Sequence, residues 1–225
     1  MLALKLGLSL TSSNNPGGWS PDKESTLEAW YKKNTNISLN GSDVSQWGDS
    51  STKGIDMVQA TASEQPAFSA GVLTFDASAT QNLQSTGQVS LEGDFTIGAK
   101  IKVTTSGGVI LGDNTTTGEF IRFSSDTQFR VRIDNTTAVN IDKNSGTWLE
   151  DAYMVLTRTS DVLKLYWKGV AQTDTETLSG TADIDSIGVR RTDLNPYDGD
   201  ISEIQIYSSS STALTNQVND YLSTL

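Results

Sequence analysis

The stretch FTIGAKIKV, residues 95–103, alternates large apolar residues with small or polar ones along its whole length. Successive side chains of a β-strand point to opposite sides, so the apolar members of this stretch fall on one face. They are Phe95, Ile97, Ala99, Ile101 and Val103. A helix would need apolar residues three or four positions apart. The stretch therefore predicts a β-strand with one buried face.

The same period of two returns on both sides of this stretch. In QFRVRID, residues 128–134, the apolar residues are expected inward, with Arg130 and Arg132 outward. Further runs are YMVLTRTS (153–160), VLKLYWKG (162–169), ADIDSIGV (182–189), ISEIQIYS (201–208) and the shorter GVLTFD, GVILGD, EFIRFS and AVNID. Gly, Asn, Asp, Ser and Thr separate these runs. Many short strands with turn residues between them favour an antiparallel sandwich or barrel over a βαβ fold.

One helix is predicted, at the C-terminal end of the chain. Thr215 can cap the segment NQVNDYLSTL, because a threonine hydroxyl accepts a hydrogen bond from the backbone of the first helical turn. Val218, Tyr221, Leu222 and Leu225 then share one face at helical spacing.

The first ten residues, MLALKLGLSL, carry an evenly spaced set of leucines: Leu2, Leu4, Leu6, Leu8 and Leu10. The turn-rich sequence TSSNNPGGWSP follows them. We expect an extended N-terminal arm over residues 1–24, which docks on a partner, and one domain over residues 25–225. An edge strand of the domain's own sheet is the alternative. Lys5 interrupts the apolar run, so no secretory signal is recognised, and no segment is long enough to cross a membrane.

The charge and the missing residue types exclude several kinds of chemistry. The chain has 225 residues, a formal net charge of −11, and neither His nor Cys. An acidic surface repels nucleic acid, which argues against it as a partner. Without His and Cys there is no Ser-His-Asp triad, thiol nucleophile or zinc–thiolate site. Carboxylate chemistry and oxygen-bound metals such as calcium stay open.

Three segments together resemble the LamG-like (concanavalin A-like) jelly-roll family. They are LEAWYKKNTNISLNGSDVSQWGDSSTKGIDMVQATASEQP (27–66), GVLTFDASATQNLQS (71–85) and YDGDISEIQIYSSSSTALTNQVNDYL (197–222). Their order and spacing match the family's opening, its Phe-Asp strand and its closing strand with a short terminal helix. The resemblance implies an all-β, two-sheet antiparallel jelly-roll sandwich, of the type found in structural proteins of tailed-phage virions and in bacterial surface proteins.

The resemblance also implies a calcium site where early and late strands meet. Asp76, Asp198 and Asp200 stand at the matching loop positions, and Asp113 with Asn114 forms a second candidate pair. Ala77 replaces the glycine that usually follows the Phe-Asp pair. The alternative is that these residues make turns without a metal.

A glycan hydrolase on this fold would need two carboxylates that face one cleft. The nearest pairs are Glu92 with Asp94, Glu150 with Asp151, Asp183 with Asp185, and Asp198 with Asp200. None shows the Glu-x-Asp-x-x-Glu pattern of glucanases that share the fold. Asp183 and Asp185 are expected on the solvated face of a strand. We therefore expect no enzymatic activity.

Sugar binding needs an exposed aromatic ring beside hydrogen-bonding side chains. Trp30, Trp47 and Trp167 are expected in the core, whereas Trp148 lies in a predicted loop or strand start. The loop RRTDLNPYDGD, residues 190–200, is the densest mixture of polar and aromatic residues. Candidate glycan-binding residues are Trp148, Arg190, Arg191, Asp193, Asn195 and Tyr197. Tyr197 could instead cover the end of the sandwich.

Two functions from different classes follow. The leading hypothesis is a non-catalytic structural or decorating protein of a tailed-phage virion, made in the host cytoplasm. Its arm would add a strand to another virion protein or to a second copy of itself. The alternative is a lectin-like adhesion module for host-surface glycans, dependent on calcium. A glycan hydrolase is a third, weaker hypothesis.

Overall fold

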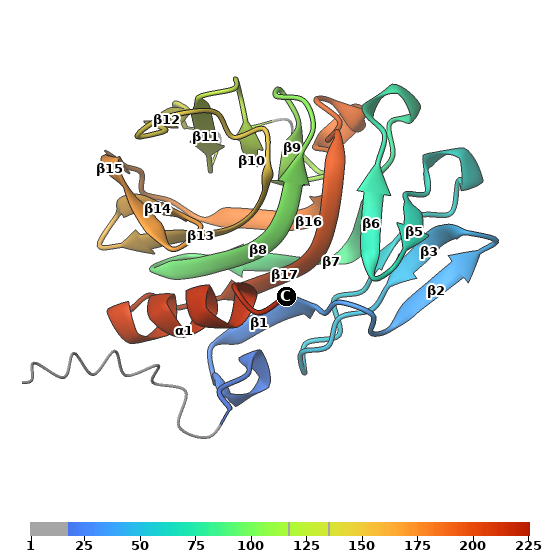
Figure 1. The fold of residues 1–225 in the computed structure, drawn as a ribbon, viewed down its shortest axis with the longest axis horizontal. Coiled ribbons are helices and arrows are strands. Elements are labelled where there is room, and N and C mark those ends of the chain that lie inside the picture. The colour runs from blue at the N-terminus through green and yellow to red at the C-terminus, as the bar shows by residue number, and fades with distance from the viewer. Residues whose placement is uncertain (1–17, 117, 135) are drawn as a thin grey trace, which may run out of the picture.

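The computed structural model describes residues 18–116, 118–134 and 136–225. Antiparallel strands form two curved layers around a shared core, as the alternation of the sequence predicts (Figure 1). The first layer contains β15 (Val170–Thr177), β14 (Val162–Trp167), β13 (Asp151–Thr159), β8 (Phe95–Val103) and β17 (Gly199–Tyr207), with β1 (Leu27–Tyr31) and β6 (Val72–Phe75) both paired along the outer edge of β17.

The second layer contains the remaining long run of paired strands. Its order is β12 (Val139–Asp142), β11 (Gln128–Arg132), β10 (Phe120–Phe123), β9 (Val109–Gly112), β16 (Ala182–Ile187), β7 (Leu83–Leu91), β4 (Met57–Val58), β3 (Asp43–Trp47) and β2 (Ile37–Asn40). Short 3₁₀ turns lie at Pro21–Lys23 (η1), Ala62–Glu64 (η2), Ala77–Ala79 (η3) and Arg191–Asp193 (η4).

Both edges of the two layers are linked. At one edge β5 (Ala67–Ser69) pairs with β3 and with β6, which belong to different layers. At the other edge the backbone N–H of Asp142 in β12 donates to the carboxylate of Asp174 in β15, at 2.7 Å. The sandwich is therefore nearly closed, which removes most of the unpaired strand edge that would invite aggregation.

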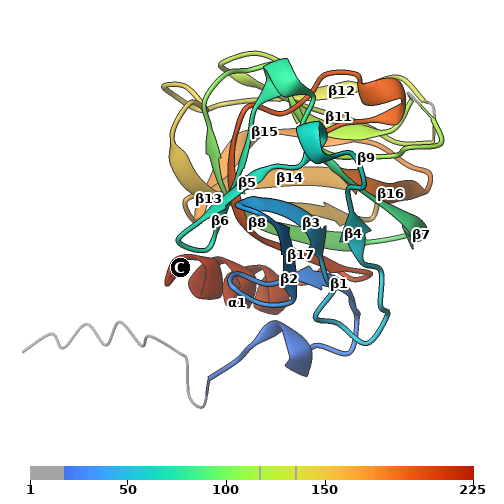
Figure 2. The ribbon, with the colours of Figure 1, turned by 90° about the vertical axis from the view of Figure 1, so that its right-hand side faces the viewer.

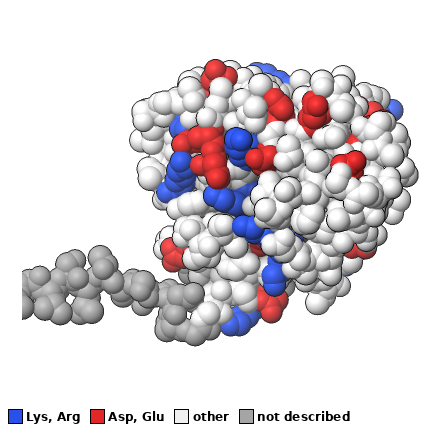
Figure 3. All heavy atoms as spheres, turned by 45° about the vertical axis from the view of Figure 1, so that its right-hand side comes forward, with Lys and Arg blue, Asp and Glu red and all other residues white. Residues whose placement is uncertain are grey.

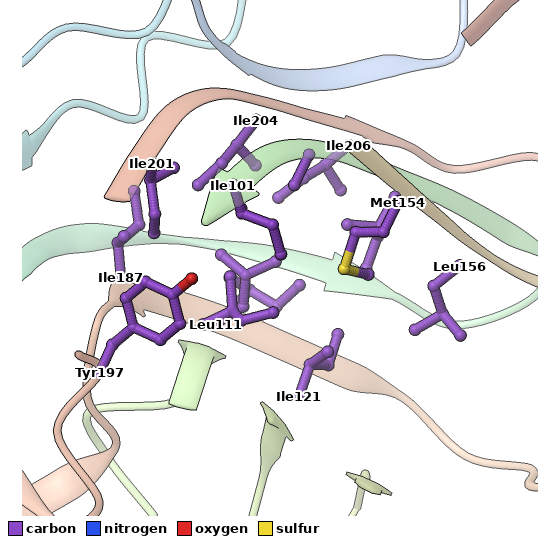
Figure 4. Packing of buried hydrophobic residues seen from close by; sticks show 14 of the residues in the cluster. Ile101, Leu111, Ile121, Met154, Leu156, Ile187, Tyr197, Ile201, Ile204 and Ile206 are labelled. Carbon is purple, nitrogen blue, oxygen red and sulfur yellow. The ribbon is translucent and has the colours of Figure 1, made fainter. Parts of the chain in front are cut away.

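Apolar side chains of both layers meet in one core. Ile101, Ile201 and Met154 of the first layer face Leu111, Ile121 and Ile187 of the second (Figure 4). Of the tryptophans expected in the core, Trp47 and Trp167 lie there at 0% and 4% exposure, and Trp30, at 4%, is buried in a second cluster described below. The prediction of a two-layer antiparallel β-sandwich is confirmed.

The helix α1 (Thr212–Leu222) covers the outer face of the first layer, as Figures 1 and 2 show. The predicted cap, Thr215, is wrong by one turn. The Ser211 hydroxyl accepts from the N–H of Leu214, so the helix begins one turn earlier, and the Thr215 hydroxyl donates to the Ser211 carbonyl. Leu214, Val218 and Leu222 pack with Leu27, Trp30, Val155 and Tyr207 in a second, smaller apolar cluster.

A glycine in β8 lets this helix approach the sheet. A Cβ atom on Gly98 would lie 2.5 Å from Cγ1 of Val218 and 3.1 Å from Cδ1 of Leu222. Among the described residues, no helix is long and apolar enough to cross a membrane.

Candidate ligand-binding face

The loop 190–197 places its aromatic residue in the core, which corrects the expectation that Tyr197 binds a glycan. The Tyr197 side chain is 0% exposed. Its hydroxyl donates to the carbonyl of Lys102 at 2.9 Å, and its ring packs against Phe75 with the centroids 6.1 Å apart. Tyr197 therefore covers the end of the sandwich, which was the alternative interpretation of this residue.

Trp148 is also unavailable to a sugar ring, so its assignment to a glycan site was wrong. It is 0% exposed and belongs to an aromatic group with Phe123, Phe129 and Trp167, with the two tryptophan rings 5.0 Å apart. The Lys143 ammonium lies 4.9 Å from the Trp148 ring centroid. The loop that carries Trp148 folds inward because this ring fills the core.

The polar residues of the same loop stay at the surface. A terminal nitrogen of Arg190 donates to the side-chain oxygen of Asn195 at 2.8 Å. Arg191 is exposed and donates to the carbonyl of Thr115 at 2.9 Å. Asp193 is exposed. Four of the six predicted glycan-binding residues are therefore positioned where a ligand can reach them.

Strands β10 and β11 bring further arginines to this loop. Arg122 of β10 lies directly opposite Arg130 of β11 in the antiparallel register, and Phe120 lies opposite Arg132. Ile121, between them, points into the core, so these side chains lie on the outward face of the second layer. The three arginines are half-buried.

Phe120 connects the strands to the loop. It is 6% exposed, and its ring lies under two cations. The guanidinium carbon of Arg122 is 5.0 Å from the ring centroid, and that of Arg190 is 4.8 Å from it. Both distances are within the range of cation–π attraction. We call Phe120, Arg122, Arg130, Arg132, Arg190 and Arg191 together the arginine face.

The guanidinium groups of the arginine face lie close enough to affect one another. Burial lowers the pKa of Arg122, and the neighbouring Arg190 and Arg130 lower it further. Burial and Arg132 likewise lower the pKa of Arg190. The Nε atom of Arg122 is buried without a hydrogen-bond partner. Neither Arg122 nor Arg130 forms an ion pair with a carboxylate in residues 18–116, 118–134 and 136–225.

An acidic cluster borders the arginine face where β9 ends. Asp113, Glu119 and Asp183 each offer an oxygen such that the three lie within 4.8 Å of one another. A Glu119 oxygen accepts from the backbone N–H of Asp183 at 2.9 Å, and burial raises the pKa of Glu119. Hard cations prefer such carboxylate oxygens, and protons also relieve their repulsion. Of the second candidate pair for calcium, Asp113 belongs to this cluster.

Asp185 lies near Asp113 and Asp183 of this cluster and is 5% exposed, so the expectation of a solvated position for it was wrong. The register of β16 against β7 shifts between Ile184 and Ser186. The side chain of Asp185 therefore does not follow the alternation that predicted its exposure. Its carboxylate accepts from the backbone N–H of Asn114. Burial first, and then Asp113 and Asp183, raise the pKa of Asp185 to about 6.

Asp76, Asp198 and Asp200, the calcium ligands suggested by the resemblance, are not among the carboxylates that form a close group in the described residues. Asp76 caps η3 by accepting from the N–H of Ser78 at 2.8 Å. Asp198 accepts from the Thr105 hydroxyl at 2.9 Å, and Asp200 from the Thr74 hydroxyl at 2.8 Å. In the described part of the chain, the three carboxylates that approach closely are those of the acidic cluster. Calcium at Asp76, Asp198 and Asp200 stays a prediction.

Other carboxylates considered for catalysis are engaged in structural contacts. Glu150 accepts from the indole N–H of Trp167 at 2.6 Å and pairs with Lys143 and Lys168 at 3.0 and 2.6 Å. Burial would raise the pKa of Glu150, but these donors outweigh burial and lower it to about 2. Asp94 accepts from the N–H of Ser160 at 2.7 Å.

On the face shown in Figure 3, acidic and basic side chains are interspersed.

The predicted arm falls largely outside the described residues, as do its leucines, Leu2, Leu4, Leu6, Leu8 and Leu10. Residues 18–24 are described, and they include a side chain that packs on the rest of the chain. The Trp19 ring centroid lies 6.4 Å from that of Tyr207 and 6.1 Å from that of Tyr221. The last residues assigned to the arm therefore contact the sandwich and its helix.

Sequence reasoning found part of the arginine face. The alternation of QFRVRID indicates that Arg130 and Arg132 point outward, and the composition of the loop singles out Arg190 and Arg191. Arg122 and Phe120 were missed as site residues. Their signal was EFIRFS, whose alternation places Arg122 outward but does not reveal which strand lies beside it.

No family model and no curated protein matches this chain. Solved structures do share its fold. Domain 4 of AbnA, a GH43 extracellular arabinanase from Geobacillus stearothermophilus, solved in complex with arabinotriose, matches with 16% identity and a TM-score of 0.57, over 88% of this chain and 98% of that one. Trypanosoma rangeli sialidase in complex with sialic acid matches with 15% identity and a TM-score of 0.57, over 89% of this chain and 33% of that one.

The likeness to these structures, at such low identity, is a likeness of fold. The chain spans nearly the whole of the arabinanase domain and about a third of the sialidase. Taken with the strand pairing described above, it shows that the chain forms an all-β, two-layer antiparallel sandwich of the jelly-roll kind with one C-terminal helix.

Proposed function

We propose that this chain is a non-catalytic module that binds glycans on the arginine face. The observation that carries the proposal is the gathering of Arg122 and Arg190 over the Phe120 ring, with Arg130 opposite Arg122, on the outward side of the second layer. Helix α1 covers the first layer instead. Domain 4 of AbnA, which has the same fold over nearly its whole length, was solved with arabinotriose, and this supports a sugar as ligand.

The non-catalytic part of the proposal is supported by the contacts of the candidate acids. Glu150 is held by three donors, and Asp94, Asp198 and Asp200 each accept a hydrogen bond that fixes a turn or strand end. A glycosidase instead needs one protonated and one ionised carboxyl group on either side of a bound sugar.

Glycan binding is tested on a broad array with the full chain. We expect specific signals that Arg130→Gln weakens and Lys102→Gln does not change. Lys102 is a matched control because it is an exposed cation of β8, in the other layer. Silence of the folded wild-type chain on the array would overturn the proposal, and release of reducing sugar from a bound glycan would overturn its non-catalytic part.

The leucine-alternating segment favours a second role in a larger assembly. We propose that the N-terminal arm, residues 1–24, anchors the module to a tailed-phage virion, as the LamG-like resemblance and the even spacing of five leucines suggest. A segment of this kind adds a strand to a neighbouring subunit through backbone hydrogen bonds. A virion appendage can also bind a host-surface glycan, so the two roles are compatible.

The proposal includes a bound calcium ion at one of two locations. One is the set of Asp76, Asp198 and Asp200, and the other is the acidic cluster. Melting curves with EDTA and with calcium chloride should differ if the ion binds, because a ligand that binds only the folded state raises Tm. Loss of the response in Asp200→Asn supports the site suggested by the resemblance, and loss in Glu119→Gln supports the acidic cluster. No response in the wild-type chain contradicts calcium binding.

A further inference from the structure

The arginine face holds an unusual share of the protein's arginines. The chain has six, and five of them lie on β10, on β11 and in the loop that borders Phe120. The remaining one, Arg158, is 1% exposed and donates to backbone carbonyls of Leu91 and Gly180. In a chain with a net charge of −11, this gathering does not follow from composition.

The arrangement is unfavourable in the protein alone. Arg122 and Arg130 occupy directly opposed positions on neighbouring strands, where like charges repel each other. Arg190 approaches the same ring as Arg122. A bound anion would relieve this repulsion, so the arginine face is suited to a negatively charged ligand.

The guanidinium groups are also held in place. The Nε atom of Arg130 donates to the side-chain oxygen of Asn140 at 2.8 Å, and Arg122 lies over the ring of Phe120. A guanidinium group carries five N–H donors, so one bond at Nε leaves the terminal nitrogens of Arg130 for other acceptors. The buried Nε of Arg122 has no partner. Planar donors fixed in this way fit carboxylates, which accept two parallel bonds.

We propose that the arginine face binds the carboxylate groups of an acidic glycan, an inference that rests on the glycan binding proposed above and narrows its ligand class. The acidic cluster of Asp113, Glu119 and Asp183 lies at the border of the face, and the whole chain is acidic. A densely charged polymer such as DNA would be repelled by these surroundings. A sugar chain fits better, because it carries at most one carboxylate per sugar ring, and its charges therefore lie further apart than those of a DNA duplex.

The test compares acidic polysaccharides with their neutral counterparts. Polygalacturonate, hyaluronan and polysialic acid are each paired with a carboxyl-reduced form, and dextran sulfate and double-stranded DNA serve as sulfate and phosphate probes. We expect at least one carboxylate polymer to bind about ten-fold or more tightly than its reduced form, DNA and dextran sulfate. This preference should shrink as salt rises.

Variants tie the preference to the face. Arg130→Gln should weaken binding to the acidic polymer about ten-fold, and Arg130→Lys should weaken it less, because a lysine keeps the charge and loses the planar fork. Lys102→Gln should leave it unchanged. If circular dichroism shows that a strand variant does not fold, Arg191→Gln, at an exposed position of the same face, replaces it in the test.

The outcomes separate this inference from the broader proposal. Equal binding of acidic and carboxyl-reduced glycans would overturn the inference and leave glycan binding intact. Tighter binding of dextran sulfate or DNA would overturn the carboxylate assignment, and no binding of any glycan would overturn both.

Discussion

Arg122 and Arg130 stand directly opposite each other on β10 and β11, so two cations share one position of an antiparallel pair. Neither forms an ion pair with a described carboxylate, although acidic residues outnumber basic ones 27 to 16 in the chain. Two like charges in directly opposed positions lower the stability of the folded protein. An anion bound between them would attract both guanidinium groups and offset their repulsion. The pair therefore links the stability of the sandwich to the proposed ligand.

The coupling between these two arginines is expected to be unfavourable in the protein without ligand. In a double-mutant cycle of Arg122→Gln and Arg130→Gln, the wild-type pair should cost about 0.2–1 kcal/mol in the free energy of unfolding. Urea denaturation at low salt measures this energy, and the same cycle at about 1 M salt should reduce it by screening. A favourable coupling energy that salt does not change would contradict the expectation.

Asp185 should make the protein more stable in mild acid. Its pKa in the folded state is about 6, whereas an unfolded Asp titrates near ~3.9. The folded protein therefore binds more protons between those values, so the contribution of Asp185 to stability falls as pH rises through this window. Asp185→Asn should keep the hydrogen bond from Asn114 and remove the cost of ionising a buried carboxyl group. At pH 7–8 we therefore expect the free energy of unfolding to rise by about 1–3 kcal/mol and Tm to rise by a few degrees.

Melting curves from pH 4 to 8 check this prediction. The gain from Asp185→Asn should disappear towards pH 4, where the wild-type carboxyl group is protonated in the folded state. Asp193→Asn, at an exposed position, is the matched control. A lower Tm for Asp185→Asn at pH 7–8 would contradict the assigned direction.

Gly98 should control how helix α1 docks. The Cβ of Gly98→Ala would lie 2.5 Å from Val218, so this substitution should destabilise the protein by about 1–3 kcal/mol through overpacking. Val218→Ala removes the atom that clashes. The double variant should therefore lose less stability than the sum of the two single variants, as urea denaturation would measure. Additive losses would show that the helix does not press on β8 at this point.

Two deletions should separate anchoring from folding. Removing residues 1–17 should abolish association with virus particles in a co-sedimentation assay while leaving Tm close to that of the full chain. Removing residues 1–24 should also lower Tm, because Trp19 packs against Tyr207 and Tyr221. Trp19→Ala alone is expected to cost about 1–3 kcal/mol. Particle binding at full occupancy after the shorter deletion would argue against the proposed arm.

The strands could be predicted from the sequence because each depends on a local pattern. FTIGAKIKV forms β8 over the predicted residues 95–103, and the two runs joined at Asp161 form the hairpin of β13 and β14. At its turn Ser160 and Asp161 both have positive φ, 49° and 66°, as a tight two-residue turn requires. Alternation alone decides such elements, whatever their partners.

The site could be predicted only in part because it depends on contacts between distant segments. That Arg122 faces Arg130 depends on the pairing of β10 with β11. Tyr197 looked like a surface aromatic within a polar loop, but Gly108 allows that loop to lie against β9, since a Cβ there would be 2.7 Å from Cα of Tyr197. The bulge that buries Asp185 likewise breaks the alternation on which its expected exposure depended.

Residues near both ends of the described chain lie beside helix α1, away from the arginine face. Trp19 packs on Tyr221 of α1, and the ammonium of Lys33 donates to the carbonyl of Leu225 at 3.0 Å. Figures 1 and 2 both place α1 and η1 at one end of the sandwich and β10–β12 towards the other. Copies tethered through the Trp19 end would all present their arginines outward. Several weak contacts made at once could then hold a surface roughly 10²–10⁴-fold more strongly than a single copy, so avidity would set the strength of attachment.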